Sequence, residues 1–171
     1  DLEGVLDPTF GDAGLVYVQD SVALYSMFID SDDSIVIGYQ NGSNQANITR
    51  IQENGQPYTM LQAGSTFGTD GTITDVFGSS VGAADQVKIT VDADGKIILA
   101  ASISGVNFMK VRRYLSSGDV DTTFNTDGSS LSVSMGGSSS DRPIISRLMA
   151  NSVGQYVITG YADYNVGTET P

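Results

Sequence analysis

Short apolar runs separated by turn residues dominate this chain, and the clearest pattern is alternation with a period of two residues. Residues 87–91 alternate apolar and polar side chains, as a half-buried strand does. Residues 97–101 form a continuous apolar run, typical of a strand buried on both faces. The four residues at 92–95 read as a hairpin turn, with Gly95 where the backbone needs a positive φ. Because no segment shows a sustained helical period, the sequence predicts an all-β fold.

A five-residue phrase recurs three times along the chain. Its copies are Phe10–Gly14, Phe67–Gly71 and Phe124–Gly128, spaced by 57 residues in both intervals and each preceded by threonine. A fixed period is the signature of a repeat architecture, in which neighbouring units bury one another's apolar faces. We therefore expect a single repeat domain over residues 1–171. Its units are expected at about residues 4–60, 61–117 and 118–171.

Further phrases follow each copy in the same order. A turn and an apolar strand come first, and an arginine-bearing strand follows in the first two units, with Arg50 and Arg113 in register. The second unit is longer than the third between its turn glycine and its phenylalanine. The third unit has Asn125 where the first two copies have glycine.

These motifs are similar to the delta-60 repeat, a bacterial β-propeller-like repeat of uncharacterised function. The resemblance rests on Leu-Asp-x-Thr-Phe-Gly, Asp-Gly-Lys-Ile-Ile and Arg-Tyr-x-x-x-Gly. Its best copies lie at residues 4–14, 87–101 and 112–128. The resemblance implies one propeller blade per repeat and no shared chemistry. We expect a propeller-like array of about three antiparallel blades, the last of them incomplete.

The repeat cycle is not completed at either end of the given sequence. Residues 1–9 match the tail of a cycle, and the third unit reaches Gly160 and Tyr161 without its arginine strand. Propellers normally have four to eight blades, and unpaired strand edges recruit other chains. Two interpretations remain open: a piece of a longer repeat protein, or head-to-tail assembly of several chains into a ring or filament. We favour assembly. The residues expected at the contact are Leu2, Val5, Leu6, Phe10, Tyr156, Val157, Ile158 and Tyr161.

The amino-acid composition argues against several classes of function. Eight basic against 20 acidic residues give a formal net charge of −12, which disfavours nucleic acid and membrane insertion. The chain has no cysteine and no histidine, so it lacks the thiol nucleophile, the commonest general base and the commonest zinc ligand. We therefore expect no enzyme activity and no cofactor. The start at Asp1 rather than methionine, the few lysines and the many small polar residues favour a secreted or cell-surface protein.

Three tyrosines are candidate ligand-binding residues: Tyr39, Tyr161 and Tyr164. Aromatic rings at the end of a blade strand can stack on a sugar or anchor a protein partner. Packing between blades is the competing interpretation.

Charged residues offer two further hypotheses. The acidic turns at residues 30–33, 92–95 and 119–121 could hold calcium through carboxylate oxygens, although aspartate is also a common turn residue. The recurrent Arg50 and Arg113 should each pair with a carboxylate, for which Asp7 and Asp121 occupy equivalent positions.

Together these features predict an extracellular, non-catalytic structural or adhesive repeat protein that self-associates by completing a terminal blade across subunits. The alternative is a ligand- or carbohydrate-binding propeller module. Another surface protein is a further possible partner.

Overall fold

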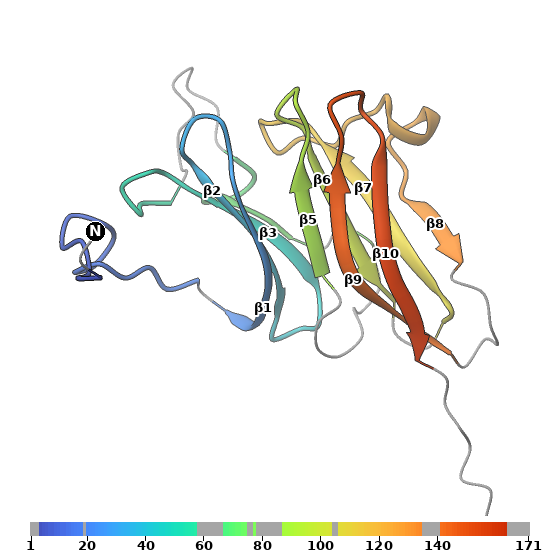
Figure 1. The fold of residues 1–171 in the computed structure, drawn as a ribbon, viewed down its shortest axis with the longest axis horizontal. Helices are drawn as coiled ribbons and strands as arrows, with labels where there is room; N and C mark the ends of the chain where they lie inside the picture. The colour runs from blue at the N-terminus through green and yellow to red at the C-terminus, as the bar shows by residue number, and fades with distance from the viewer. Residues whose placement is uncertain are drawn as a thin grey trace, which may run out of the picture.

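The computed structural model describes residues 4–18, 20–57, 67–74, 77, 87–103, 106–134 and 141–163. It contains three antiparallel sheets that lie side by side (Figure 1). The first blade consists of β1 (Ser21–Ile29), β2 (Ile35–Asn41), β3 (Ala46–Ile51) and β4 (Thr72–Thr74). The second consists of β5 (Val87–Val91), β6 (Ile97–Ser102), β7 (Phe108–Tyr114) and β8 (Leu131–Ser134). The third consists of β9 (Arg142–Ala150) and β10 (Tyr156–Asp163).

The expected fold class is confirmed. The sheets follow one another along the chain, and within each sheet the strands pair in sequence order. The only helical element among the described residues is a 3-10 turn at Phe124–Thr126. The described strands do not close into a ring, so the array has two ends, at the first and third blades.

The first hairpin has the same turn geometry in all three blades. Asp33, Gly95 and Gly154 occupy the same position of this turn, with φ of 60°, 73° and 75°. In the second blade, Gly95 N donates to Asp92 O at 3.0 Å and Asp92 N donates to Lys96 O at 3.0 Å. The predicted positive φ at Gly95 is therefore confirmed. The shared turn puts the three hairpins in a common register, so their residues can be compared one by one.

The recurring phrase does not open a sheet but leads into the last strand of the preceding one. Phe67–Gly71 runs into β4, and Phe124–Gly128 precedes β8. The first copy, Phe10–Gly14, has no sheet before it among the described residues. At the position of Gly11 and Gly68, the third copy has Asn125, which also adopts a positive φ of 47°. Asparagine tolerates this left-handed conformation better than most residues, so the turn survives the substitution.

The core lies between the blades rather than within any one of them. Val36 and Ile48 of the first blade pack with Ile89 and Leu99 of the second, and Phe67 is fully buried in the same cluster. A second cluster joins the second and third blades. Its buried members are Ile98, Ala100, Met109, Val111, Ile145 and Leu148. Each blade is therefore stabilised by its neighbours, as the repeat predicts.

Candidate functional site

The side of the first blade that faces away from the second blade is more exposed than the equivalent sides of the two later blades. The hairpin registers make Leu24, Val87 and Ile145 equivalent, because they pair with Tyr39, Ala101 and Gly160 at the same strand position. Val87 is 0% exposed and Ile145 is 1% exposed, because each packs against the preceding blade, whereas Leu24 is 57% exposed. This strand position is therefore buried in the second and third blades and exposed in the first.

The next equivalent positions on these strands repeat the pattern. Met27 corresponds to Ile89 and Leu148, and their exposed fractions are 65%, 5% and 7%. Ile29 is exposed where its equivalent Val91 is buried. We call Leu24, Met27 and Ile29 the first-blade face. It is an apolar sheet surface of the kind that the second and third blades bury.

The other end of the array carries a matching surface. Val157 on β10 corresponds to Ile98 on β6 and Val36 on β2, and it is 47% exposed where both of these are 0% exposed. Tyr161 and Met149 are exposed on the same side of the third blade. We call Met149, Val157 and Tyr161 the last-blade face. Within the array, the equivalent side of each earlier blade packs on the front of the next.

The residues predicted for self-association divide between these surfaces and the core. Val157 and Tyr161 lie on the last-blade face, whereas Tyr156 and Ile158, on the opposite side of β10, pack against the second blade. In the N-terminal segment, residues 4–18, Val5 and Leu6 are exposed and Phe10 is half buried. Leu2 lies outside the described residues.

The N-terminal segment docks on the first blade as the second copy of the phrase docks on the second blade. Gly11 N donates to Asn54 O at 2.8 Å, and a Cβ at Gly55 would lie 2.5 Å from Gly11 N. The equivalent approach recurs in the next blade, where a Cβ at Gly118 would lie 3.1 Å from Gly68 N. Glycine allows this close approach because it has no side chain.

The structure separates the three candidate tyrosines. Tyr39 is buried, and this burial raises the pKa of its phenol. Tyr161 is well exposed, and Tyr164 lies outside the described residues. The presumed equivalence of Tyr39 and Tyr161 is wrong: Tyr39 is the fifth residue of β2 and Tyr161 the sixth of β10. Because strand side chains alternate, the two rings point to opposite sides of their blades.

Each recurrent arginine binds carboxylates and also reaches the following blade. Arg113 Nε donates to Asp121 Oδ2 at 2.8 Å, which confirms the expected pair, and its Nη1 donates to the hydroxyl of Tyr156 at 3.0 Å. Arg50 does not pair with Asp7. Its Nη2 lies 2.7 Å from Asp30 Oδ2, and its Nη1 donates to Ser116 O at 3.1 Å.

The sequence contains the reason for this different pairing. In the second unit, Gly64 stands at the repeat position that Asp121 occupies in the third, so no carboxylate is supplied there. Asp7 shares the local geometry of Asp121: Thr9 and Thr123 each donate their backbone N at 2.9 Å and their hydroxyl at 2.6 Å to the Oδ1 of the aspartate. The matching loops explain why sequence comparison treated the two aspartates alike.

The environment of Asp121 strongly favours its charged form. The pKa of Asp121 lies far below its ordinary value, and the hydrogen bond from the Thr123 hydroxyl is the largest cause. Burial raises this pKa, but the backbone hydrogen bond from Thr123, the hydrogen bond from Lys96 and the charge of Arg113 lower it further. Lys96 Nζ lies 3.1 Å from Asp121 Oδ2. The carboxylate therefore belongs to a structural ion cluster between the β5–β6 turn, β7 and the loop that follows β7.

In the acidic turns, aspartate carboxylates accept hydrogen bonds from backbone N–H groups of the same turn. Asp92 Oδ1 accepts hydrogen bonds from the backbone N of Asp94 and Lys96, at 3.0 and 2.9 Å. Asp32 Oδ1 accepts from Ser34 N at 3.1 Å. No cluster of three or more acidic residues suited to a metal ion occurs within the described part of the chain. Calcium binding at these turns stays a prediction.

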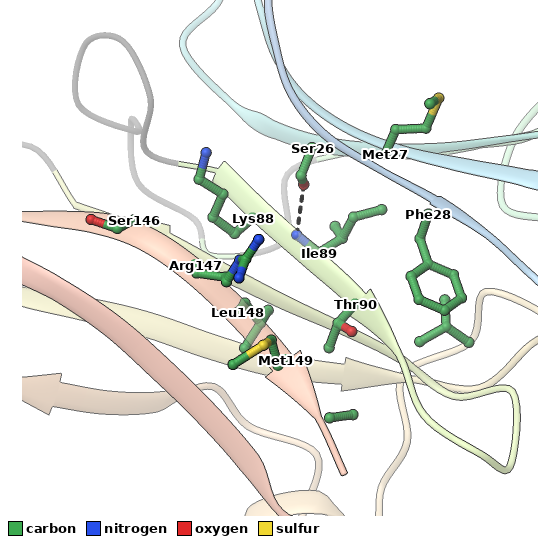
Figure 2. Close-up of a pocket in the computed structure, with 12 residues that line it drawn as sticks. Ser26, Met27, Phe28, Lys88, Ile89, Thr90, Ser146, Arg147, Leu148 and Met149 are labelled. Carbon is green, nitrogen blue, oxygen red and sulfur yellow. Dashed lines mark hydrogen bonds between the residues drawn. The ribbon is translucent and has the colours of Figure 1, made fainter. Parts of the chain in front are cut away.

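A groove runs along the first strands of the three blades, which lie next to one another (Figure 2). It encloses about 700 Å³ and is lined by residues of β1, β5 and β9. Ser26 Oγ accepts a hydrogen bond from Ile89 N at 2.8 Å, which ties the first blade to the second at the groove. Sequence reasoning did not single out this groove, because its residues become neighbours only through packing of the blades.

Comparison with known proteins bears on the repeat rather than on any activity. Residues 93–124 match the family model "Domain of unknown function (DUF5122) beta-propeller". The match spans β6, β7 and the loop to Phe124, and so contains Arg113 and Asp121. No curated protein and no solved structure matches the chain. Among the described residues, no helix is long and apolar enough to cross a membrane. Over residues 93–124 the chain is similar to a β-propeller family of unknown function, and its three sheets form a propeller-like array.

Proposed function

We propose that this chain is a non-catalytic interaction module that associates head to tail with further copies of itself. In this arrangement, the last-blade face of one copy packs on the first-blade face of the next. The single observation that carries the proposal is the exposure of Leu24 and Met27, whose equivalents in both later blades are buried. The chain therefore contains two internal examples of the contact that it would make with a neighbour.

The two faces are complementary in kind. Within the array, the side of the first blade that carries Val36 packs on Ile89 and Leu99 of the second. Val157 is the equivalent of Val36 on the third blade, and Met27 is the equivalent of Ile89 on the first. Joining the two ends would extend the series of blades by one more interface of the same type. Such an interface is heterologous, so it leads to a closed ring or to a filament.

Covering the first-blade face would supply only part of the free energy that association needs. Full burial of a leucine, isoleucine or methionine side chain is worth about 1.5–3 kcal/mol. Leu24, Met27 and Ile29 are each about 60% exposed, so covering them contributes roughly 3–5 kcal/mol. Association costs about 4–15 kcal/mol in lost freedom of motion. The last-blade face and the exposed Val5 and Leu6 must therefore contribute as well.

A location outside the cell is part of the same proposal. The net charge of −12 keeps the module soluble, and the absence of cysteine makes its fold independent of the redox state of its surroundings. An adhesive or structural role then follows from repeated association of copies. Identity with the delta-60 repeat is also proposed, and the propeller match at residues 93–124 supports it at the level of the architecture.

Light scattering across a range of concentrations tests the association. We expect the mass to rise above that of a monomer, and the double substitution Leu24→Lys with Met27→Lys to return it to the monomer value. Leu131→Lys is the matched control, because Leu131 is a similarly exposed leucine on β8, away from both end faces. A well-folded monomer at every concentration would refute self-association and point to blades supplied by a longer chain.

A further inference from the structure

The groove along the first strands contains one repeat position that carries a polar side chain in all three blades. Ser26, Lys88 and Arg147 are each three residues before the end of their strand, so they are equivalent in the three blades. All three line the groove (Figure 2). The same position therefore places one hydroxyl and two cations along a single surface.

The charge of this groove is opposite to that of the chain. The sequence has only eight basic residues against 20 acidic ones, and two of the eight line the groove. None of the described residues that line it is acidic. Lys88 is half buried on β5, and Arg147 is exposed on the neighbouring β9. Both cations can donate charge-assisted hydrogen bonds to an anion in the groove.

The rest of the lining is mixed in character. Thr90 and Ser146 add hydroxyl groups, and Phe28, Leu148 and Met149 add apolar surface. Hydroxyls that donate and accept hydrogen bonds suit the hydroxyls of a sugar, and apolar side chains suit the carbon face of its ring. A carboxylate on the same sugar would meet the guanidinium of Arg147 and the ammonium of Lys88.

We propose that this groove binds an acidic saccharide, with Lys88 and Arg147 contacting its carboxylates and the hydroxyls of Ser26, Thr90 and Ser146 contacting its hydroxyl groups. The site is distinct from the candidate tyrosines. It goes beyond the proposed self-association. The groove lies within one copy of the chain, and it shares Met27 with the first-blade face and Met149 with the last-blade face.

Calorimetric titration with trigalacturonate tests the proposal, and galactotriose serves as the neutral probe of the same ring size. We expect trigalacturonate to bind at least tenfold more tightly than galactotriose. Lys88→Gln and Arg147→Gln should each weaken its binding at least fivefold. Lys110→Gln is the matched control, since Lys110 lies on β7 with its ammonium 5.6 Å from the centre of the Phe108 ring and does not line the groove. Circular dichroism of each variant confirms that it is folded.

Three results would overturn the proposal: no binding of trigalacturonate, equal binding of the neutral sugar, or unchanged affinity in both groove variants. Inorganic sulfate is a further probe. If sulfate alone binds as tightly as trigalacturonate, the groove is a simple anion site and the saccharide assignment is wrong. The mass of each sample, measured under the same conditions, keeps a failure of self-association separate from a failure of ligand binding.

Discussion

Removing the guanidinium of Arg50 should strongly destabilise the array. Arg50 is 3% exposed and connects three parts of the molecule. Its Nη2 lies 2.7 Å from Asp30, its Nε donates to Ser34 Oγ at 2.9 Å, and its Nη1 donates to Ser116 O at 3.1 Å. The last bond joins the first blade to the second. Arg50→Met keeps most of the aliphatic side chain but removes all of these interactions.

The size of the stability loss is set mainly by Asp30, the carboxylate that loses its cation. The Asp30 side chain is only 7% exposed, so Arg50→Met leaves a buried carboxylate without its cation, which costs about 3–5 kcal/mol. The second pair, with Asp32, adds at most about 1 kcal/mol, because that side chain is 45% exposed and its interaction is screened by water. We therefore expect the free energy of unfolding to fall by roughly 3–6 kcal/mol.

Urea unfolding followed by far-ultraviolet circular dichroism measures this loss. Arg147→Met is the matched control, since Arg147 is an exposed arginine and its removal should change the free energy of unfolding by less than about 0.5 kcal/mol. The double variant Arg50→Met with Asp30→Leu should recover at least half of the loss, because it also removes the unpaired carboxylate. A loss below about 1 kcal/mol, or a double variant no more stable than the single one, would refute the reasoning.

Two further predictions concern the blade interfaces. The pKa of Asp121 is lowered in the folded state, first by the hydrogen bond from the Thr123 hydroxyl. The charged carboxylate therefore stabilises the fold above pH ~4, and this stabilisation is lost as the pH falls below that value. Asp121→Asn should weaken the dependence of the melting temperature on pH in this acid range, measured by thermal unfolding at a series of pH values. Phe67→Ala should cost about 3–5 kcal/mol in urea unfolding, because Phe67 is fully buried between blades. Phe10→Ala should cost less than half as much, since Phe10 is half buried, and equal losses would contradict the assigned packing.

Much of the fold could be predicted because its signals are local. The alternation in Val87–Val91 and the apolar run after Gly95 identified strands that the structure contains as β5 and β6. The positive φ at Gly95 follows from the conformational preference of one residue. The 57-residue recurrence predicted units that pack on one another, and the two interblade cores confirm this packing.

The candidate site could not be predicted in the same way, because its properties depend on which segments meet in space. Sequence comparison assigned Asp7 to an arginine partner, but Arg50 binds Asp30 instead, since the turn before β2 brings that carboxylate close. It also equated Tyr39 with Tyr161, and a shift of one residue along the strand places them on opposite sides of their blades.

The sequence by itself determined the strands, the turns and the repeat, since each is specified by the preferences of neighbouring residues. Only the tertiary structure decided which copies of an apolar position are covered: Val87 and Ile145 are buried by a preceding blade, whereas Leu24 is left open. It likewise brought Ser26, Lys88 and Arg147 into one groove from strands about 60 residues apart. Burial and charge environment arise from contacts between distant segments, which a local pattern does not specify.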